Sequence, residues 1–156
     1  MYQVMEYNET YDEKVKAFIT GIFIEEFEFE QYREDIKNEN IFMDYMSKGG
    51  NFWIAIDKDN NIIGTIGAKV LENNILEIKR VYVRKDCRGN GISQNLLNIL
   101  ESFAIKNGFK NLFLGTYDKL ERAIGFYYKN NFVDDESREK EEGVKYMSKS
   151  LMENHV

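Results

Sequence analysis

The sequence contains no proline, one cysteine and one histidine among its 156 residues. A single cysteine, Cys87, cannot form a disulfide within the chain or supply the several thiolates of a zinc–cysteine site. The histidine, His155, stands next to the C-terminal residue, which argues against Ser–His–Asp catalysis and histidine-based metal sites. Without proline, tight turns must be built from glycine, asparagine and aspartate. We therefore expect a functional site that contains no metal.

Positive charge is also scarce. The 21 lysines and arginines are outnumbered by 27 aspartates and glutamates, which gives a net charge of −6. This balance argues against a general nucleic-acid-binding protein, which needs a basic surface. Attraction of a cationic substrate and solubility alone explain the negative charge about equally well. The first residues lack the apolar run of a signal peptide, and no stretch is long and apolar enough for a transmembrane helix. We expect a cytoplasmic protein with no membrane partner.

The hydrophobic pattern predicts one α+β domain over residues 1–156, because 43% of the residues are hydrophobic and the length suits a single core. Segment 24–30 fits either a helix or a strand. Strands 52–56, 62–71 and 75–83 form an antiparallel meander, and the strand–helix–strand order that follows predicts a parallel pair. Other strands are expected at 1–7, 111–116, from 132 and at 144–151, and helices from 11 into the low twenties, at 38–47, 92–106 and 119–129.

The most informative stretch is 81–93, in which a strand runs into a glycine-rich turn and then a helix. This order builds an anion site, because unpaired backbone N–H groups and the positive end of the helix dipole point at one spot. A Walker A loop would need Lys and then Ser or Thr after Gly91, where Ile92 and Ser93 stand. A Rossmann loop would need a third glycine where Gln94 stands. A plain turn without a ligand remains the alternative from the loop alone.

Two segments resemble the motifs of GNAT-superfamily N-acetyltransferases. The hexapeptide Arg-Gly-Asn-Gly-Ile-Ser at 88–93 is similar to the family signature Arg/Gln-x-x-Gly-x-Gly/Ala, which cradles the acetyl-CoA pyrophosphate. Segment 121–132 is similar to the second motif, N-E-R-A-I-x-F-Y-x-K-x-G-F. The chain departs from the pattern at Lys85 (often proline), Ser93 (usually Gly or Ala) and Leu120 (often Asn).

The resemblance implies the GNAT fold. That fold is a single mixed, mostly antiparallel sheet of six to seven strands, flanked by about four helices. Its central parallel strand pair forms the cofactor cleft. The resemblance also implies that acetyl-CoA is the acetyl donor, and that it is held by Val81, Tyr82, Val83, Arg88, Gly89, Asn90, Gly91, Ile92 and Ser93.

Two residues are the expected catalysts. Tyr127 stands at the tyrosine of the second motif and would protonate the departing coenzyme A thiolate, a role open to a hydroxyl that keeps its proton at neutral pH. Glu77 lies on strand 75–83, where some family members place a general base. A carboxyl with a pKa near ~4.3 is a poor base unless burial raises it. An ion pair within the sheet is the alternative interpretation of Glu77.

The implied reaction is direct transfer of an acetyl group to a primary amine of a small molecule or a protein. Another acyl-CoA donor, or binding without catalysis, stays open as an alternative. Cys87 is a conceivable acetyl carrier, although its place in a loop needs no such role. The acidic residues Glu25, Glu26, Glu28 and Glu30 suit either a cationic acceptor or a solvated face. The sequence does not identify the acceptor, and it does not decide between a monomer and the homodimer common in the family.

Overall fold

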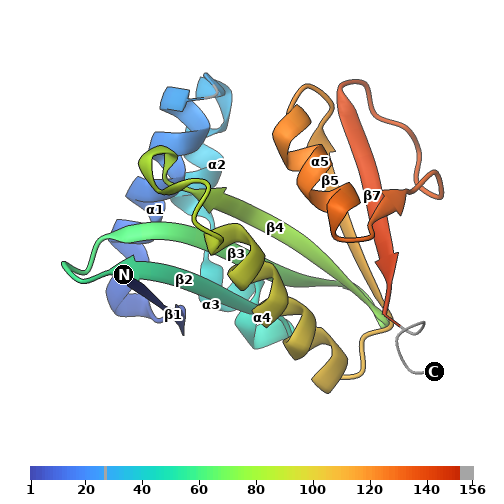
Figure 1. Ribbon diagram of the computed structural model, residues 1–156, viewed down its shortest axis with the longest axis horizontal. Coiled ribbons are helices and arrows are strands. Elements are labelled where there is room, and N and C mark those ends of the chain that lie inside the picture. Colours follow the sequence, from blue (N-terminus) through green and yellow to red (C-terminus); the bar gives the residue numbers. More distant parts are fainter. Residues whose placement is uncertain (27, 152–156) are drawn as a thin grey trace.

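The computed structural model, which describes residues 1–26 and 28–151, shows one seven-stranded sheet with helices on both faces (Figure 1). The strand order is β1-β2-β3-β4-β5-β7-β6, and every neighbouring pair is antiparallel except β4 and β5. The mixed sheet and its central parallel pair confirm the expected fold. The strands are β1 (Tyr2–Glu6), β2 (Asn51–Asp57), β3 (Ile62–Glu72), β4 (Ile75–Val83), β5 (Asn111–Tyr117), β6 (Val133–Asp134) and β7 (Val144–Ser150).

The described part of the chain contains five α-helices, where about four were expected. None of its helices is both long and apolar enough to cross a lipid bilayer. The α-helices are α1 (Asp12–Thr20), α2 (Arg33–Asn38), α3 (Ile41–Asp44), α4 (Ile92–Lys106) and α5 (Glu121–Lys129). Shorter helical turns are η1 (Glu9–Tyr11), the π-helical η2 (Gly21–Glu26), η3 (Glu30–Tyr32), η4 (Met46–Lys48) and η5 (Lys85–Cys87).

The prediction of one continuous helix over 38–47 is wrong. Helix α2 ends at Asn38, and Glu39 has an extended backbone. The side chain of Asn40 then accepts a hydrogen bond from the backbone N–H of Met43 at 3.0 Å and starts α3. Asparagine favours such N-caps because its side chain satisfies an otherwise unpaired helical N–H group. The cap therefore divides a segment whose apolar spacing reads as one helix.

The sheet separates two hydrophobic cores. One lies between the sheet and helices α4 and α5, and it includes Leu76 and Ile78 of β4. The other lies between the sheet and helices α1–α3, which Figure 1 shows on the face away from α4. Gly67 of β3 faces this second core, since a Cβ atom there would lie 2.8 Å from the ring of Tyr45. Of the β4 side chains, Leu76 and Ile78 belong to the first core, whereas Tyr82 packs against the second.

Strands β4 and β5 diverge along most of their length. They pair only where Ile75–Glu77 lies beside Asn111–Phe113. A bulge then adds one residue to β4, because Tyr82 pairs with Thr65 whereas Lys79 pairs with Gly67. Bulges bend a strand and increase its twist. Beyond Glu77, the edge of β4 that faces β5 therefore has no strand partner, and a gap opens between the two strands.

The bulge is fixed by hydrogen bonds around Arg80. Its φ of 57° lies in the left-handed region, which is uncommon for a residue other than glycine. The Thr65 hydroxyl donates to the Arg80 carbonyl at 2.8 Å, and the Arg80 Nε donates to Glu39 at 3.1 Å. These contacts oppose the backbone strain of the bulge.

Candidate functional site

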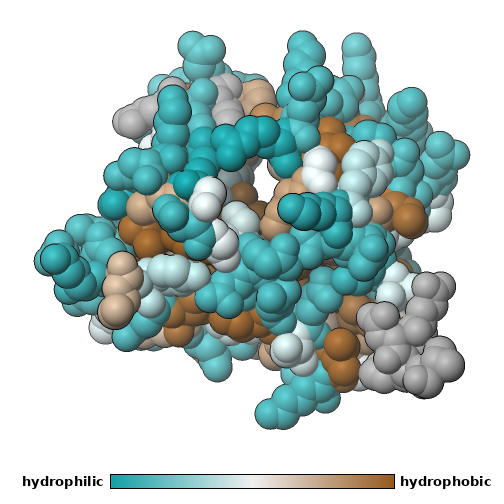
Figure 2. Space-filling view, in the orientation of Figure 1, coloured by the Kyte–Doolittle hydropathy of each residue, from teal (hydrophilic) through white to brown (hydrophobic). Residues whose placement is uncertain are grey.

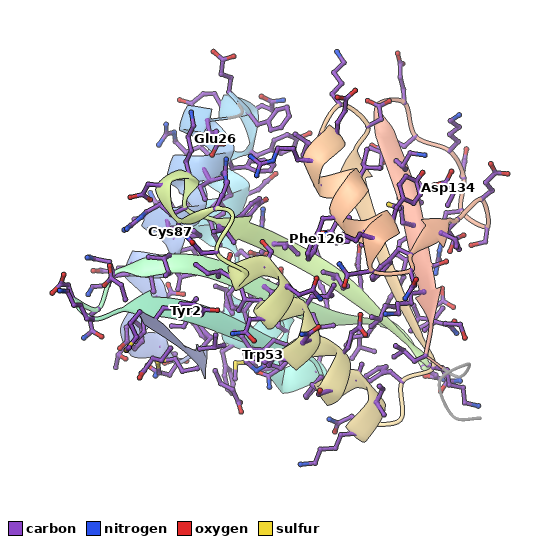
Figure 3. All side chains as sticks on the ribbon, in the orientation of Figure 1. Tyr2, Glu26, Trp53, Cys87, Phe126 and Asp134 are labelled. Carbon is purple, nitrogen blue, oxygen red and sulfur yellow. The ribbon has the colours of Figure 1, made fainter. Side chains whose placement is uncertain are left out.

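A groove of about 1100 Å³ lies where β4 and β5 separate. We call it the splay groove. Its walls come from the second half of β4, the loop that follows it, the start of α4, the end of β5, and α5. Figure 2 shows an opening near the centre of this face, with hydrophilic residues around much of its rim. Figure 3 places Glu26 and Cys87 on one side of the opening and Phe126 of α5 on the other.

The glycine loop forms one end of the splay groove. Gly89 and Gly91 have φ values of 82° and 78°, and a Cβ atom at either position would meet nothing within 4 Å. No side chain caps α4, and the bond from Asn95 N–H to the Gly91 carbonyl, at 3.0 Å, is an early bond of the helix. The N–H groups of Ile92 and Ser93 therefore have no intrahelical partner, which suits them to bind an anion.

The structure brings most of the expected cofactor residues together on this groove. Asn90 does not line it; its side-chain amide donates to the Cys87 carbonyl at 3.1 Å and so braces the loop. Cys87 itself lines the groove wall. The other expected residues all line the groove: Val81, Tyr82, Val83, Arg88, Gly89, Gly91, Ile92 and Ser93.

Arg88 is bonded to the protein itself. Its two terminal nitrogens contact the two carboxylate oxygens of Glu26 at 2.5 and 2.7 Å, and its Nε donates to the Val83 carbonyl at 3.0 Å. The hydrogen bonds from Arg88 hold the pKa of the Glu26 carboxyl below its usual range. This pair ties the glycine loop to the end of η2. Of the acidic cluster named from the sequence, Glu26 is thus a groove residue, whereas Glu28 is exposed and Glu30 pairs with Arg33 at 2.8 Å.

The splay groove is rich in positive charge although the whole chain carries −6. Among the described residues, its lining includes seven lysines and arginines but only Glu26 and Glu121 as acids. Sequence analysis missed most of these cations because they are scattered over three segments that the fold brings together. Such a concentration of one charge favours a ligand with several negative charges. The seven are Lys79, Arg80, Lys85, Arg88, Lys119, Arg122 and Lys129.

Tyr127 lies on α5 with only 6% of its surface exposed, and it lines the splay groove. Its ring packs edge-on against Phe126 and Phe132, with centroids 5.5 Å away in each case. Burial, and to a smaller extent the nearby Tyr82, raise the pKa of the Tyr127 hydroxyl well above its usual value. No hydrogen bond links the hydroxyl to residues 1–26 and 28–151, and the oxygen is open to the groove, since none of the buried side-chain oxygens in this part of the chain lacks a partner. It is therefore a protonated donor at neutral pH.

Glu77 does not line the splay groove. It lies between Leu76 and Ile78, which belong to the same core as Tyr127, so its side chain points to the opposite face of the sheet. There it lines a smaller pocket of about 250 Å³, which shares Ile78, Gly115 and other wall residues with the groove. Within the described chain, Glu77 forms no ion pair. The two expected catalysts thus lie in adjoining cavities.

Aromatic side chains from distant segments surround the smaller pocket, which we call the aromatic pocket. Sequence analysis missed them, because no motif links positions so far apart. Burial and a hydrogen bond with Tyr32 raise the pKa of Tyr117 to about 12. The pocket is lined by Phe23, Tyr32, Asp35, Glu77, Ile78, Lys79, Arg80, Tyr82, Gly115 and Tyr117.

Comparison with known proteins identifies the family. The sequence model of the acetyltransferase (GNAT) family matches residues 8–132. The probable N-acetyltransferase camello of Xenopus laevis is 35% identical over 98 residues, which cover 61% of this chain and 43% of the relative. The chain spans less than half the length of the curated relatives that it matches first.

Solved structures agree over nearly the whole chain. An acetyltransferase of the GNAT family from Staphylococcus aureus Mu50 superposes with a TM-score of 0.87 at 30% identity, covering 97% of this chain and 99% of that one. PaiA N-acetyltransferase from Thermoplasma acidophilum, solved in complex with coenzyme A, has a TM-score of 0.72 at 18% identity and covers 97% and 99% of the two chains.

Proposed function

Because the chain belongs to the acetyltransferase (GNAT) family, we propose that it transfers the acetyl group of acetyl-CoA to a primary amine. The observation that carries this proposal is the splay groove, where unpaired helical N–H groups, two open glycines and an excess of cations converge. These features suit a long ligand with several phosphates. The coenzyme A bound to PaiA N-acetyltransferase, which has the same fold, supports this choice of donor.

Each part of the donor has a matching part of the groove. The pyrophosphate would lie against the N–H groups of 89–93, where the open Cβ positions allow close approach. The pantetheine amides would pair with the free edge of β4 near Val81, since that edge has no strand partner beyond Glu77. Lys119, Arg122 and Lys129 would face the remaining phosphate charge.

The two catalytic candidates divide the proton transfers. The amine nitrogen attacks the thioester carbon, the new C–N bond forms, and the C–S bond breaks to release the coenzyme A thiolate. Tyr127 would give its proton to that thiolate, because its hydroxyl is protonated, lies on the wall of the splay groove and is free to donate. An alkylamine has a pKa near ~10.4, so freeing its lone pair at pH 7 costs roughly 4–5 kcal/mol. Glu77 would accept the amine proton, directly or through water.

A thiol-release assay tests the proposal. Acetyl-CoA would be mixed with the protein and a panel of primary amines, and each product would be checked by mass spectrometry for one added acetyl group. We expect turnover with at least one amine and thermal stabilisation by acetyl-CoA alone, since a ligand at 100 times its Kd adds about 2.7 kcal/mol. Stabilisation without turnover would point to a binding module instead. Absence of both stabilisation and turnover would overturn the donor assignment as well.

A further inference from the structure

The aromatic pocket holds two opposite charges that the protein leaves unpaired. Glu77 and Lys79 are two residues apart on β4, so both side chains point to the same face of the sheet. Both are half-buried, and neither has an ion pair or hydrogen bond among the described residues. Arg80, the other cation in the pocket, is already paired with Glu39 at 3.1 Å. The pocket therefore offers one free ammonium, Lys79, and the carboxylate of Glu77 beside it, with the carboxylate of Asp35 elsewhere on the wall.

Four aromatic side chains form another part of the wall. The ring of Phe23 lies 5.5 Å from Tyr32, 6.1 Å from Tyr82 and 6.3 Å from Tyr117, measured between centroids. Phe29 stacks on Tyr117 at 4.6 Å behind this wall. Rings packed this closely present apolar faces to a bound molecule, with a few hydroxyl groups at their edges. The wall thus suits the apolar or aromatic part of a small ligand.

We propose that the aromatic pocket binds an α-amino acid with an apolar or aromatic side chain as the acetyl acceptor. The α-ammonium would face Glu77, the α-carboxylate would pair with Lys79, and the side chain would lie against the aromatic rings. This inference rests on the proposed acetyltransferase function. It makes Lys79 the residue that determines specificity for acceptors with a carboxylate next to the amine. The shared walls place this amine next to the splay groove and its thioester.

The charges also disfavour other acceptors. A simple amine would bring its positive charge beside Lys79 without neutralising it, and like charges brought together cost binding energy. An acidic amino acid would bring a second carboxylate, and Asp35 adds negative charge at the pocket wall. A neutral amino acid pairs with both Glu77 and Lys79 and brings no further charge to the pocket.

The test compares amino acids with the amines that remain when their carboxylates are removed. Values of kcat/KM would be measured for L-phenylalanine against phenethylamine and for L-leucine against 3-methylbutylamine. We expect the wild-type protein to prefer the amino acid, and Lys79→Gln to reduce this preference about 10- to 100-fold, mainly through the KM of the amino acid. Lys79→Arg should retain much of the preference. The ratio of the two kcat/KM values is compared between variants, so the different basicities of the amino acid and the amine cancel.

Lys37→Gln is the matched control, because Lys37 is an exposed cation of α2 that does not line the pocket, and its loss should leave the preference unchanged. Turnover of amines with no preference for the carboxylate, or an unchanged preference in Lys79→Gln, would overturn the inference while the acetyltransferase function stands. Failure of every amine, together with no binding of acetyl-CoA, would overturn the proposed function itself.

Titration of L-phenylalanine into the protein saturated with coenzyme A tests the pocket without turnover. Absence of binding in this titration would also contradict the inference.

Discussion

Replacing Tyr127 by phenylalanine tests the proposed general acid with a minimal change. The substitution removes one oxygen and keeps the ring that packs on Phe126 and Phe132. The hydroxyl forms no hydrogen bond within residues 1–26 and 28–151, so the folded protein should lose little stability. A positioned general acid contributes about 10²–10⁴-fold to a rate, which corresponds to about 3–5 kcal/mol of transition-state free energy.

The assay is steady-state thiol release for the wild-type protein, Tyr127→Phe and a control. We expect kcat to fall at least about 100-fold while the KM for acetyl-CoA changes little, because the hydroxyl acts after the donor is bound. Tyr128→Phe is the control. This substitution also removes a tyrosine hydroxyl from α5, but Tyr128 is exposed and its hydroxyl donates to Asp134 at 2.5 Å. Activity should therefore be unchanged.

The pH dependence adds a second readout. Burial raises the pKa of Tyr127 well above 10, so this group should cause no loss of wild-type activity between pH 7 and 10. A kcat for Tyr127→Phe close to that of the wild type would refute the general-acid role. An equal loss of kcat in Tyr128→Phe would show that the assay reports damage to α5 rather than chemistry.

Three further predictions concern the loop, the groove and the buried tyrosines. Gly91→Ala places a Cβ at a φ of 78°, which should cost about 1–2 kcal/mol in thermal denaturation and weaken acetyl-CoA binding in a titration; unchanged affinity would contradict the loop assignment. The Kd for acetyl-CoA should rise several-fold between low salt and about 1 M salt, where the Debye length shrinks to about 3 Å; a salt-independent Kd would argue against the groove cations. The pKa values of Tyr7, Tyr45 and Tyr127 are all raised by burial, so these groups keep their protons in the folded state after the unfolded chain begins to lose them near pH 10. Their contribution to stability is therefore complete below pH 10 and should be lost as pH rises above it, which denaturant titrations at pH 8–11 would show.

Local patterns were sufficient to predict the parts of the fold that depend on neighbours in sequence. Alternation and turn residues located strands β2 to β5, and the distance between β4 and β5 in sequence predicted their parallel pairing. The break between α2 and α3 escaped prediction, because the Asn40 cap outweighs an unbroken helical spacing. The bulge at Arg80 also escaped, since it depends on the Thr65 hydroxyl from a neighbouring strand.

The candidate site divides in the same way. The glycine loop and Tyr127 could be predicted as site residues because each belongs to a short motif, and the fold places both on the splay groove. The aromatic pocket was not found, because Phe23, Tyr32 and Tyr117 meet only after the sheet and helices have packed. Arg88 was expected among the cofactor residues, but no local pattern could show that Glu26 holds its side chain.

The central claim is that the splay groove binds acetyl-CoA along the free edge of β4 and against the glycine loop. Titration of the isotope-labelled protein with acetyl-CoA, followed by amide NMR, tests it most directly. The account predicts saturable shifts that are largest for the N–H groups of Val81, Gly89, Gly91 and Ile92, with smaller changes in α1. No shifts at millimolar acetyl-CoA, or shifts confined to residues outside the groove, would contradict it.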